Sequence, residues 1–175
     1  MGKIAPAKPV KLIIGFIFKD KRSFEKARVM LAGRFGKIDF ESRAVPFALT
    51  DYYQPEFGTG LQRVFISFKR LVDPEELPQI KALTNRMESR FSAGNKRLVN
   101  IDPGYLNLAK LVLASTKDYV HRIYLKKGIY AETTLFFRGK GFQAWQWTYP
   151  DFRTEEYRDI FNQIREIFNQ QVSNE

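Results

Sequence analysis

The stretch Val10–Phe18, VKLIIGFIF, is a nearly continuous run of apolar residues, many of them β-branched or aromatic. A run of this length without polar alternation is typical of a strand that is buried on both faces in the middle of a sheet. Lys19 and Asp20 end the run. We therefore predict a central strand here and interpret the neighbouring segments by their relation to it.

Between this run and residue 101, the hydrophobic pattern predicts three further strands and two helices. In chain order they occupy residues 23–35, 38–47, 63–71, 74–91 and 96–101. The resulting order, strand–helix–strand–strand–helix–strand, is that of a ferredoxin-like sheet. We predict an α+β protein with a mainly antiparallel sheet, a ferredoxin-like part over residues 10–101 and helices chiefly on one face.

Residues 102–175 are predicted to add a helix, a β-meander and a final helix to this part. Asp102-Pro103-Gly104 has the composition of a turn. Residues 106–115 fit a short buried helix, although the spacing of their leucines also permits strands. The last helix begins near Thr154. Three runs with strand character, joined by hairpin-like turns, lie between these helices at residues 121–125, 128–138 and 142–147.

Composition and charge bound the class of protein. With 175 residues, 44% of them hydrophobic, the chain is predicted to be one globular domain, residues 1–175, after a flexible lead-in over residues 1–9. The chain has no cysteine, which excludes disulfides and cysteine nucleophiles. No apolar run suits a membrane span or a signal peptide, so we expect a cytoplasmic protein with no membrane partner. The formal net charge of +10 favours anionic partners such as nucleotides, RNA or phosphorylated metabolites.

Polar groups suited to chemistry are densest between Asn100 and Glu132, a stretch that holds the only histidine, His121. Histidine is the side chain best suited to proton transfer near neutral pH. We therefore predict His121, Asp102 and Glu132 as catalytic candidates. The residues predicted to bind ligand are Lys110, Arg122 and Arg153, which could hold phosphate, together with Asp151, Tyr105 and Tyr130.

The same residues permit two other interpretations. Asp102, His121, Glu132 and Asp151 could converge on one Mg²⁺ or Mn²⁺ ion, with Mg²⁺ as the candidate cofactor. These residues could instead be ordinary caps, turns and paired surface groups. If residues 121–125 form a regular strand, His121 and Arg122 point to opposite sides of it, so only a bulge would let both face one pocket.

Six short segments of the sequence are similar to those of a known family. They are Asp51–Tyr53, Asn100–Leu106, Lys110–Lys117, His121–Leu125, Lys127–Glu132 and Trp147–Asp151. Together they resemble a prokaryotic family known as domain of unknown function four-four-one-six, over nearly the whole chain. The family has no established activity, but some relatives carry the label GTP-binding protein. A phosphate-binding P-loop needs Gly-x-x-x-x-Gly-Lys-Ser/Thr between a strand and a helix, and this sequence contains no such motif.

Three functions follow from these observations. The first is binding of an anionic ligand, a nucleotide or RNA, in a cleft between the ferredoxin-like part and the C-terminal part. The second is an enzyme that acts on a small phosphorylated substrate, with His121 as the acid–base group. The third is a structural or interaction protein without a small-molecule site. An RNA-binding sheet would expose aromatic rings, and a groove could be lined by Tyr52, Tyr53, Trp145, Trp147 and Tyr149.

Overall fold

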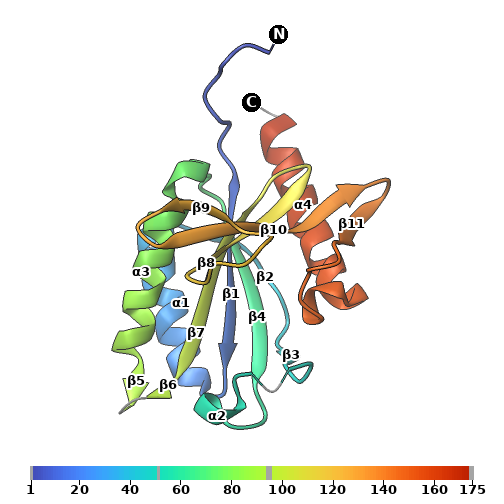
Figure 1. Cartoon of the computed structure of the whole chain (residues 1–175). Coiled ribbons are helices and arrows are strands. Elements are labelled where there is room, and N and C mark those ends of the chain that lie inside the picture. The colour runs from blue at the N-terminus through green and yellow to red at the C-terminus, as the bar shows by residue number, and fades with distance from the viewer. Residues whose placement is uncertain (1, 51, 94–95, 174–175) are drawn as a thin grey trace.

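The computed structural model describes residues 2–50, 52–93 and 96–173 (Figure 1). Asp51, the first residue of the segments quoted above, lies outside them. Most of the strands join one antiparallel sheet in the order β11-β10-β8-β7-β1-β4-β2, with β3 paired to β4 and β9 paired to β10. The predicted class, mixed helix and strand with a mainly antiparallel sheet, is confirmed.

The helices and strands have the following bounds. The strands are β1 (Lys11–Phe18), β2 (Ile38–Glu41), β3 (Val45–Pro46), β4 (Gln62–Phe68), β5 (Ser92–Ala93), β6 (Lys96–Arg97), β7 (Val99–Leu106), β8 (Lys110–Ser115), β9 (Ile123–Lys126), β10 (Ile129–Arg138) and β11 (Gly141–Ala144). The α-helices are α1 (Lys21–Phe35), α2 (Gln54–Phe57), α3 (Leu77–Arg90) and α4 (Glu155–Ser173), and the 3₁₀ helices are η1 (Pro74–Glu76) and η2 (Asp151–Arg153).

Strand β1 lies in the middle of the sheet, and all eight of its residues are buried. It pairs antiparallel with β4 on one side and with β7 on the other. Alternate residues of β1 contribute to two separate cores, Leu12, Ile14 and Phe16 to one and Ile13 to the other. The prediction of a central strand that is buried on both faces is therefore confirmed.

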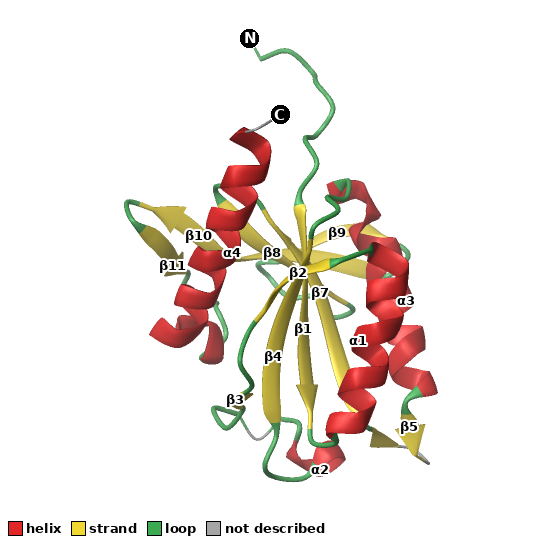
Figure 2. Ribbon diagram, turned by 180° about the vertical axis from the view of Figure 1, so that it is seen from behind, coloured by secondary structure: helices red, strands yellow, loops and turns green. Residues whose placement is uncertain are grey.

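The two faces of the sheet are covered by different helices (Figure 2). Helices α1 and α3 pack on the face that holds Leu12 and Ile14, whereas α4 packs against Ile13 and Phe65 on the opposite face. The prediction that the helices lie chiefly on one face is wrong for α4. Because β1 and β4 are apolar on both faces, a second layer has to cover the face that α1 and α3 leave open.

Two predictions for the middle of the chain are also wrong. Asp102-Pro103-Gly104 is not a turn but lies within β7, and residues 106–115 do not form a helix, because Lys110–Ser115 is strand β8. β8 pairs with β7 on one side and with β10 on the other. These cross-strand hydrogen bonds outweigh the local turn and helix preferences of the segment. The strand alternative for its leucines is the correct one.

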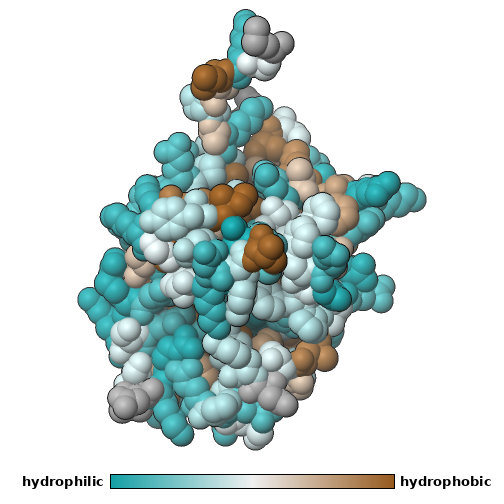
Figure 3. Space-filling model, in the orientation of Figure 1, coloured by the Kyte–Doolittle hydropathy of each residue, from teal (hydrophilic) through white to brown (hydrophobic). Residues whose placement is uncertain are grey.

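The surface seen in the orientation of Figure 1 is mainly hydrophilic, with hydrophobic residues in small separate areas (Figure 3). Residues 2–9 lead into β1 without regular structure and are exposed. Within the described parts of the chain, no helix has the length and apolar character that a membrane span requires.

Candidate functional site

A cavity of about 600 Å³ lies where β7 and β8 separate. The pairing of these strands covers only three residues of β7, Gly104–Leu106. Pro103, which precedes them, has no N–H group to donate to a neighbouring strand. On the other side of Pro103 the strands diverge, and both line the cavity: β7 with Asn100 and Asp102, and β8 with its C-terminal residues and the loop that follows.

Arg63, from β4, lies at the buried end of the cavity and is 4% exposed. Its Nη2 donates to Asp151 Oδ2 at 3.1 Å, and its Nη1 donates to Asp102 Oδ2 at 3.5 Å. Its Nε has no hydrogen-bond partner among the described residues. Burial alone would lower the pKa of Arg63, but the carboxylates, above all Asp151, raise it. Three rings lie with their centroids 5.1–5.5 Å from the central guanidinium carbon: Phe47, Phe65 and Phe152.

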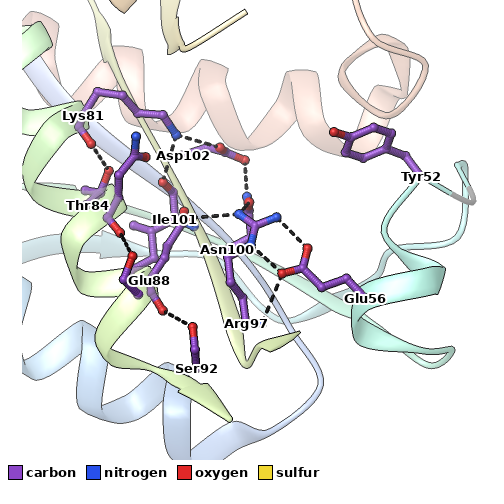
Figure 4. A network of polar contacts seen from close by, with 12 residues as sticks. Tyr52, Glu56, Lys81, Thr84, Glu88, Ser92, Arg97, Asn100, Ile101 and Asp102 are labelled. Atoms are coloured by element: carbon purple, nitrogen blue, oxygen red, sulfur yellow. Dashed lines mark hydrogen bonds and ion pairs between the residues drawn. The ribbon is translucent and has the colours of Figure 1, made fainter. Parts of the chain in front are cut away.

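Lys81, from the buried face of α3, approaches Asp102 from the other side (Figure 4). Its Nζ donates to Asp102 Oδ1 at 3.4 Å and to the Ile101 carbonyl at 3.5 Å. Asn100 Nδ2 donates to Asp102 Oδ2 at 2.7 Å. Burial alone would raise the pKa of Asp102, but Lys81 and Arg63 hold it below its ordinary value of 3.8. Asp102 is therefore a carboxylate that connects two buried cations.

Arg97 forms the next part of this network and is held by two acids (Figure 4). Its Nε and Nη2 donate to the two oxygens of Glu56, both at 2.7 Å, and its Nη1 donates to Glu88 at 2.7 Å. Arg97 lowers the pKa of Glu56, whereas burial raises the pKa of Glu88. Because its donors are bound by carboxylates, Arg97 has little remaining capacity for a ligand. Tyr52 points towards this network from the segment before α2.

The wall formed by β8 and β10 is built around the buried ion pair of Arg122 and Glu132. Arg122 Nε donates to Glu132 Oε2 at 2.7 Å, Nη1 donates to the Ser115 hydroxyl at 2.8 Å, and Nη2 donates to the Tyr149 hydroxyl. His121 Nε2 lies 3.2 Å from the same Glu132 oxygen. All three guanidinium nitrogens of Arg122 are thus occupied, and Glu132 connects Arg122 to His121.

Four of the nine predicted site residues line this cavity. The cavity opens where β7 and β8 diverge, and its lining residues come from segments far apart in the sequence. His121 is not itself a lining residue but reaches the cavity through Glu132. The predicted residues that line the cavity are Asp102, Arg122, Glu132 and Asp151.

The structure places the other four predicted residues elsewhere. Arg153 donates to the carbonyls of Thr148 and Gln146 and is not among the lining residues. Lys110 lies at the opposite end of β8, about 17 Å along the strand from Ser115. The ring of Tyr130 packs edge-on against Tyr124. Tyr105 is half-buried against the core between the sheet, α1 and α3.

Several lining residues were missed by the sequence analysis, chief among them Arg63 and Lys81. A pattern in the sequence points to Lys81. Lys81, Thr84 and Glu88 follow Leu77 at helical spacing, and all are buried on one stripe of α3. Polar residues on a stripe that continues an apolar face indicate a buried polar network. Arg63 carries no comparable pattern, because it stands at the start of an alternating strand where a cation is ordinarily exposed.

The four residues considered for Mg²⁺ divide into two pairs. Asp102 and Asp151 both bind Arg63, whereas Glu132 binds Arg122 and His121. In the described chain, no three His, Asp or Glu side chains come together as a set that could hold a metal ion. The chemistry that the cavity offers is hydrogen bonding by buried cations and acids, with aromatic rings beside them.

The lowered pKa of Asp102 predicts how the stability of the protein depends on pH. A carboxyl group whose pKa is lower in the folded state stabilises that state above the unfolded pKa, near 3.8, and loses this contribution as the pH falls through the folded value. We therefore expect Asp102→Asn to destabilise the protein at neutral pH and the difference from wild type to shrink below about pH 4. Urea unfolding of both proteins between pH 7 and pH 2 measures this. A difference that stays constant over the whole range would contradict the prediction.

Comparison with known proteins agrees with the resemblance noted in the sequence. Residues 8–168 match the family described as domain of unknown function (DUF4416). No curated protein and no solved structure gives a significant match. Because the match spans nearly the whole chain, including both walls of the cavity, this protein belongs to the DUF4416 family.

Proposed function

We propose that the cavity binds an anionic molecule of nucleotide size, with its phosphate on Arg63 and Lys81. The observation that carries this proposal is the unused donor capacity of these two buried cations. Charge-assisted hydrogen bonds are normally about 2.7–2.9 Å long. The contacts of Asp102 with Arg63 and Lys81 are 3.5 and 3.4 Å, and Arg63 Nε has no partner among the described residues. Phosphate oxygens would give Lys81 Nζ and Arg63 Nη1 acceptors at normal distance.

The residues at the mouth of the cavity favour a ligand with a flat, polar group next to its phosphate. Tyr52, Tyr119 and Tyr149 line the cavity and are exposed. Lys117 Nζ lies 4.2 Å from the centroid of the Tyr52 ring and donates to its hydroxyl, so this exposed pair has both a cation and a ring at the opening. Tyrosine rings with a free edge suit the face of a nucleobase. A volume of about 600 Å³ is within the range of sites for molecules of this size.

We infer further that the cavity lies at the edge of a ferredoxin-like unit within a single domain. The order β7-β1-β4-β2, with every neighbouring pair antiparallel, supports this assignment. Helices α1 and α3 contribute to one core with β1, which also agrees with it. In this assignment β8, β10 and the segments 116–122 and 149–152 form the second wall of the cleft, as expected for a ligand held between the two parts.

Ligand binding is tested by calorimetric titration with GTP, ATP, AMP, inorganic phosphate and adenosine at two salt concentrations. We expect the phosphorylated compounds to bind and to bind more weakly at the higher salt. Lys81→Met should weaken their binding about 10–100-fold, the loss expected for one charged hydrogen bond, and leave adenosine binding unchanged. The matched control is Lys26→Met, which removes an exposed cation from α1. No binding by wild type, or equal binding by Lys81→Met, would overturn the proposal.

A second candidate function is an enzyme that acts on a small phosphorylated substrate. The observation in its favour is the pair of His121 and Glu132 at the cavity wall, because a carboxylate that holds an imidazole is a common acid–base arrangement. To test this function, nucleoside mono-, di- and triphosphates are incubated with the protein, and their conversion is followed by phosphorus NMR. Turnover that His121→Gln abolishes without changing affinity would support this function, and turnover that survives the substitution would exclude His121 from it.

A further inference from the structure

Five aromatic rings form a column beside the cavity, which we call the aromatic ladder. Successive ring centroids are 6.1, 5.6, 5.1 and 4.3 Å apart, and the first three pairs are nearly parallel, at 18°, 13° and 9°. Nearly parallel rings at these separations are offset from one another, so they overlap only in part. In order from the cavity, the ladder consists of Tyr119, His121, Trp147, Trp145 and Phe136.

The ladder is accessible and begins at the cavity mouth. Tyr119 is 53% exposed and Trp145 is 37% exposed. Tyr119 also lines the cavity, and the guanidinium carbon of Arg122 lies 4.6 Å from the centroid of its ring. His121, the second ring, binds Glu132 on the cavity wall. A chain-like ligand with one unit in the cavity would therefore pass directly onto the ladder.

The segment that carries the ladder is rich in positive charge, which favours a polyanion as this ligand. Between residues 109 and 150 the chain has seven lysines and arginines against two acids, Asp118 and Glu132. Glu132 is buried and bound to Arg122, so it does not offset the exposed cations. The exposed cations of this region are Lys117, Lys126, Lys127, Arg138 and Lys140.

We propose that the ligand of the cavity is an unpaired nucleotide of a single-stranded nucleic acid, and that the next bases of the strand stack on the aromatic ladder. Aromatic rings beside a positively charged surface are the general means by which proteins bind single strands. The exposed lysines would contact the phosphates, and Arg63 and Lys81 would hold the phosphate of the nucleotide in the cavity. This inference rests on the proposed function of the cavity and extends it from a free nucleotide to a strand.

The chain carries its own reporter for this interaction. It has two tryptophans, Trp145 and Trp147, and both belong to the ladder. Stacking of a base on an indole ring quenches its fluorescence, so tryptophan emission, excited at wavelengths that tyrosine does not absorb, reports occupation of the ladder. We would titrate the full chain with a mononucleotide and with RNA and DNA strands of two, four and six nucleotides at two salt concentrations.

We expect affinity to rise about tenfold or more from the mononucleotide to the tetranucleotide, with tryptophan emission quenched only by the longer strands. Trp145→Leu should remove most of this gain and leave mononucleotide affinity unchanged. The matched control, Tyr124→Leu, removes an exposed ring of β9 that is outside the ladder and should change neither value. Comparison of the RNA and DNA series identifies which strand is preferred.

The outcomes separate this inference from the proposed function. Mononucleotide binding without a gain in affinity or quenching by longer strands would overturn the inference and leave the proposed function intact. Failure of every nucleotide and strand to bind would overturn both. A gain with length that survives Trp145→Leu would remove the ladder from the interaction. If wild type is a dimer in sedimentation, Trp145→Leu is a monomer and no strand binds, the ladder is an interface between copies and the inference is wrong.

Discussion

Replacing Arg63 with methionine is expected to lower the free energy of unfolding by about 3–5 kcal/mol. Arg63 is 4% exposed, and it lies between the carboxylates of Asp102 and Asp151. Methionine fills part of the volume but leaves Asp151, which is also buried, without its opposite charge. An uncompensated buried carboxylate accounts for most of the expected loss. Urea unfolding at pH 7 measures it.

The control for this prediction is a second substitution that restores charge balance. Arg63→Met combined with Asp151→Asn removes the unpaired negative charge of residue 151, so the double variant should be more stable than Arg63→Met alone. A loss below about 1 kcal/mol for Arg63→Met, or a double variant that is less stable than the single one, would show that the ion pair does not hold this end of the cavity together.

Gly104→Ala is expected to destabilise the protein by about 3 kcal/mol or more, at the upper end for overpacking. A Cβ atom at Gly104 would lie 2.4 Å from the Val112 carbonyl oxygen and 2.6 Å from a methyl group of Leu113. The carbonyl belongs to the backbone of β8, so the two strands would have to separate where their short pairing holds the cavity wall in place. Thermal and urea unfolding measure the effect on stability. We also expect the substitution to weaken binding of the proposed ligand.

The matched control is the same substitution on α1. Gly33 is helical, and an added Cβ would meet no atom within 4 Å. Gly33→Ala should therefore stabilise the protein by about 0.5–1 kcal/mol, because alanine favours the helix over glycine. Equal effects of the two substitutions, in sign and size, would contradict the close approach of β7 and β8 at Gly104.

Local sequence predicts only some of the residues of the candidate site. The cluster of polar residues around the single histidine predicts Asp102, Glu132 and Arg122 as site residues, and the structure places them at one cavity. Lys110 belongs to the same cluster but lies at the other end of β8, since proximity in sequence says nothing about which end of a strand faces the cleft. Arg153, in η2, donates to two backbone carbonyls instead. The role proposed for each of them as a phosphate ligand passes instead to Arg63 and Lys81.

The apolar run VKLIIGFIF is enough to predict a strand that is buried on both faces, because residues of this composition cannot be exposed on either side. The excess of positive charge and the exclusion of cysteine chemistry also follow from the residues alone. The position of the cavity and the groups that share it follow only from the packing of the folded chain. Arg63 and Asp151 are 88 residues apart, and they meet because β7 and β8 diverge at Pro103 and α4 covers the second face of the sheet. Such a contact depends on the pairing of whole strands, which no local pattern encodes.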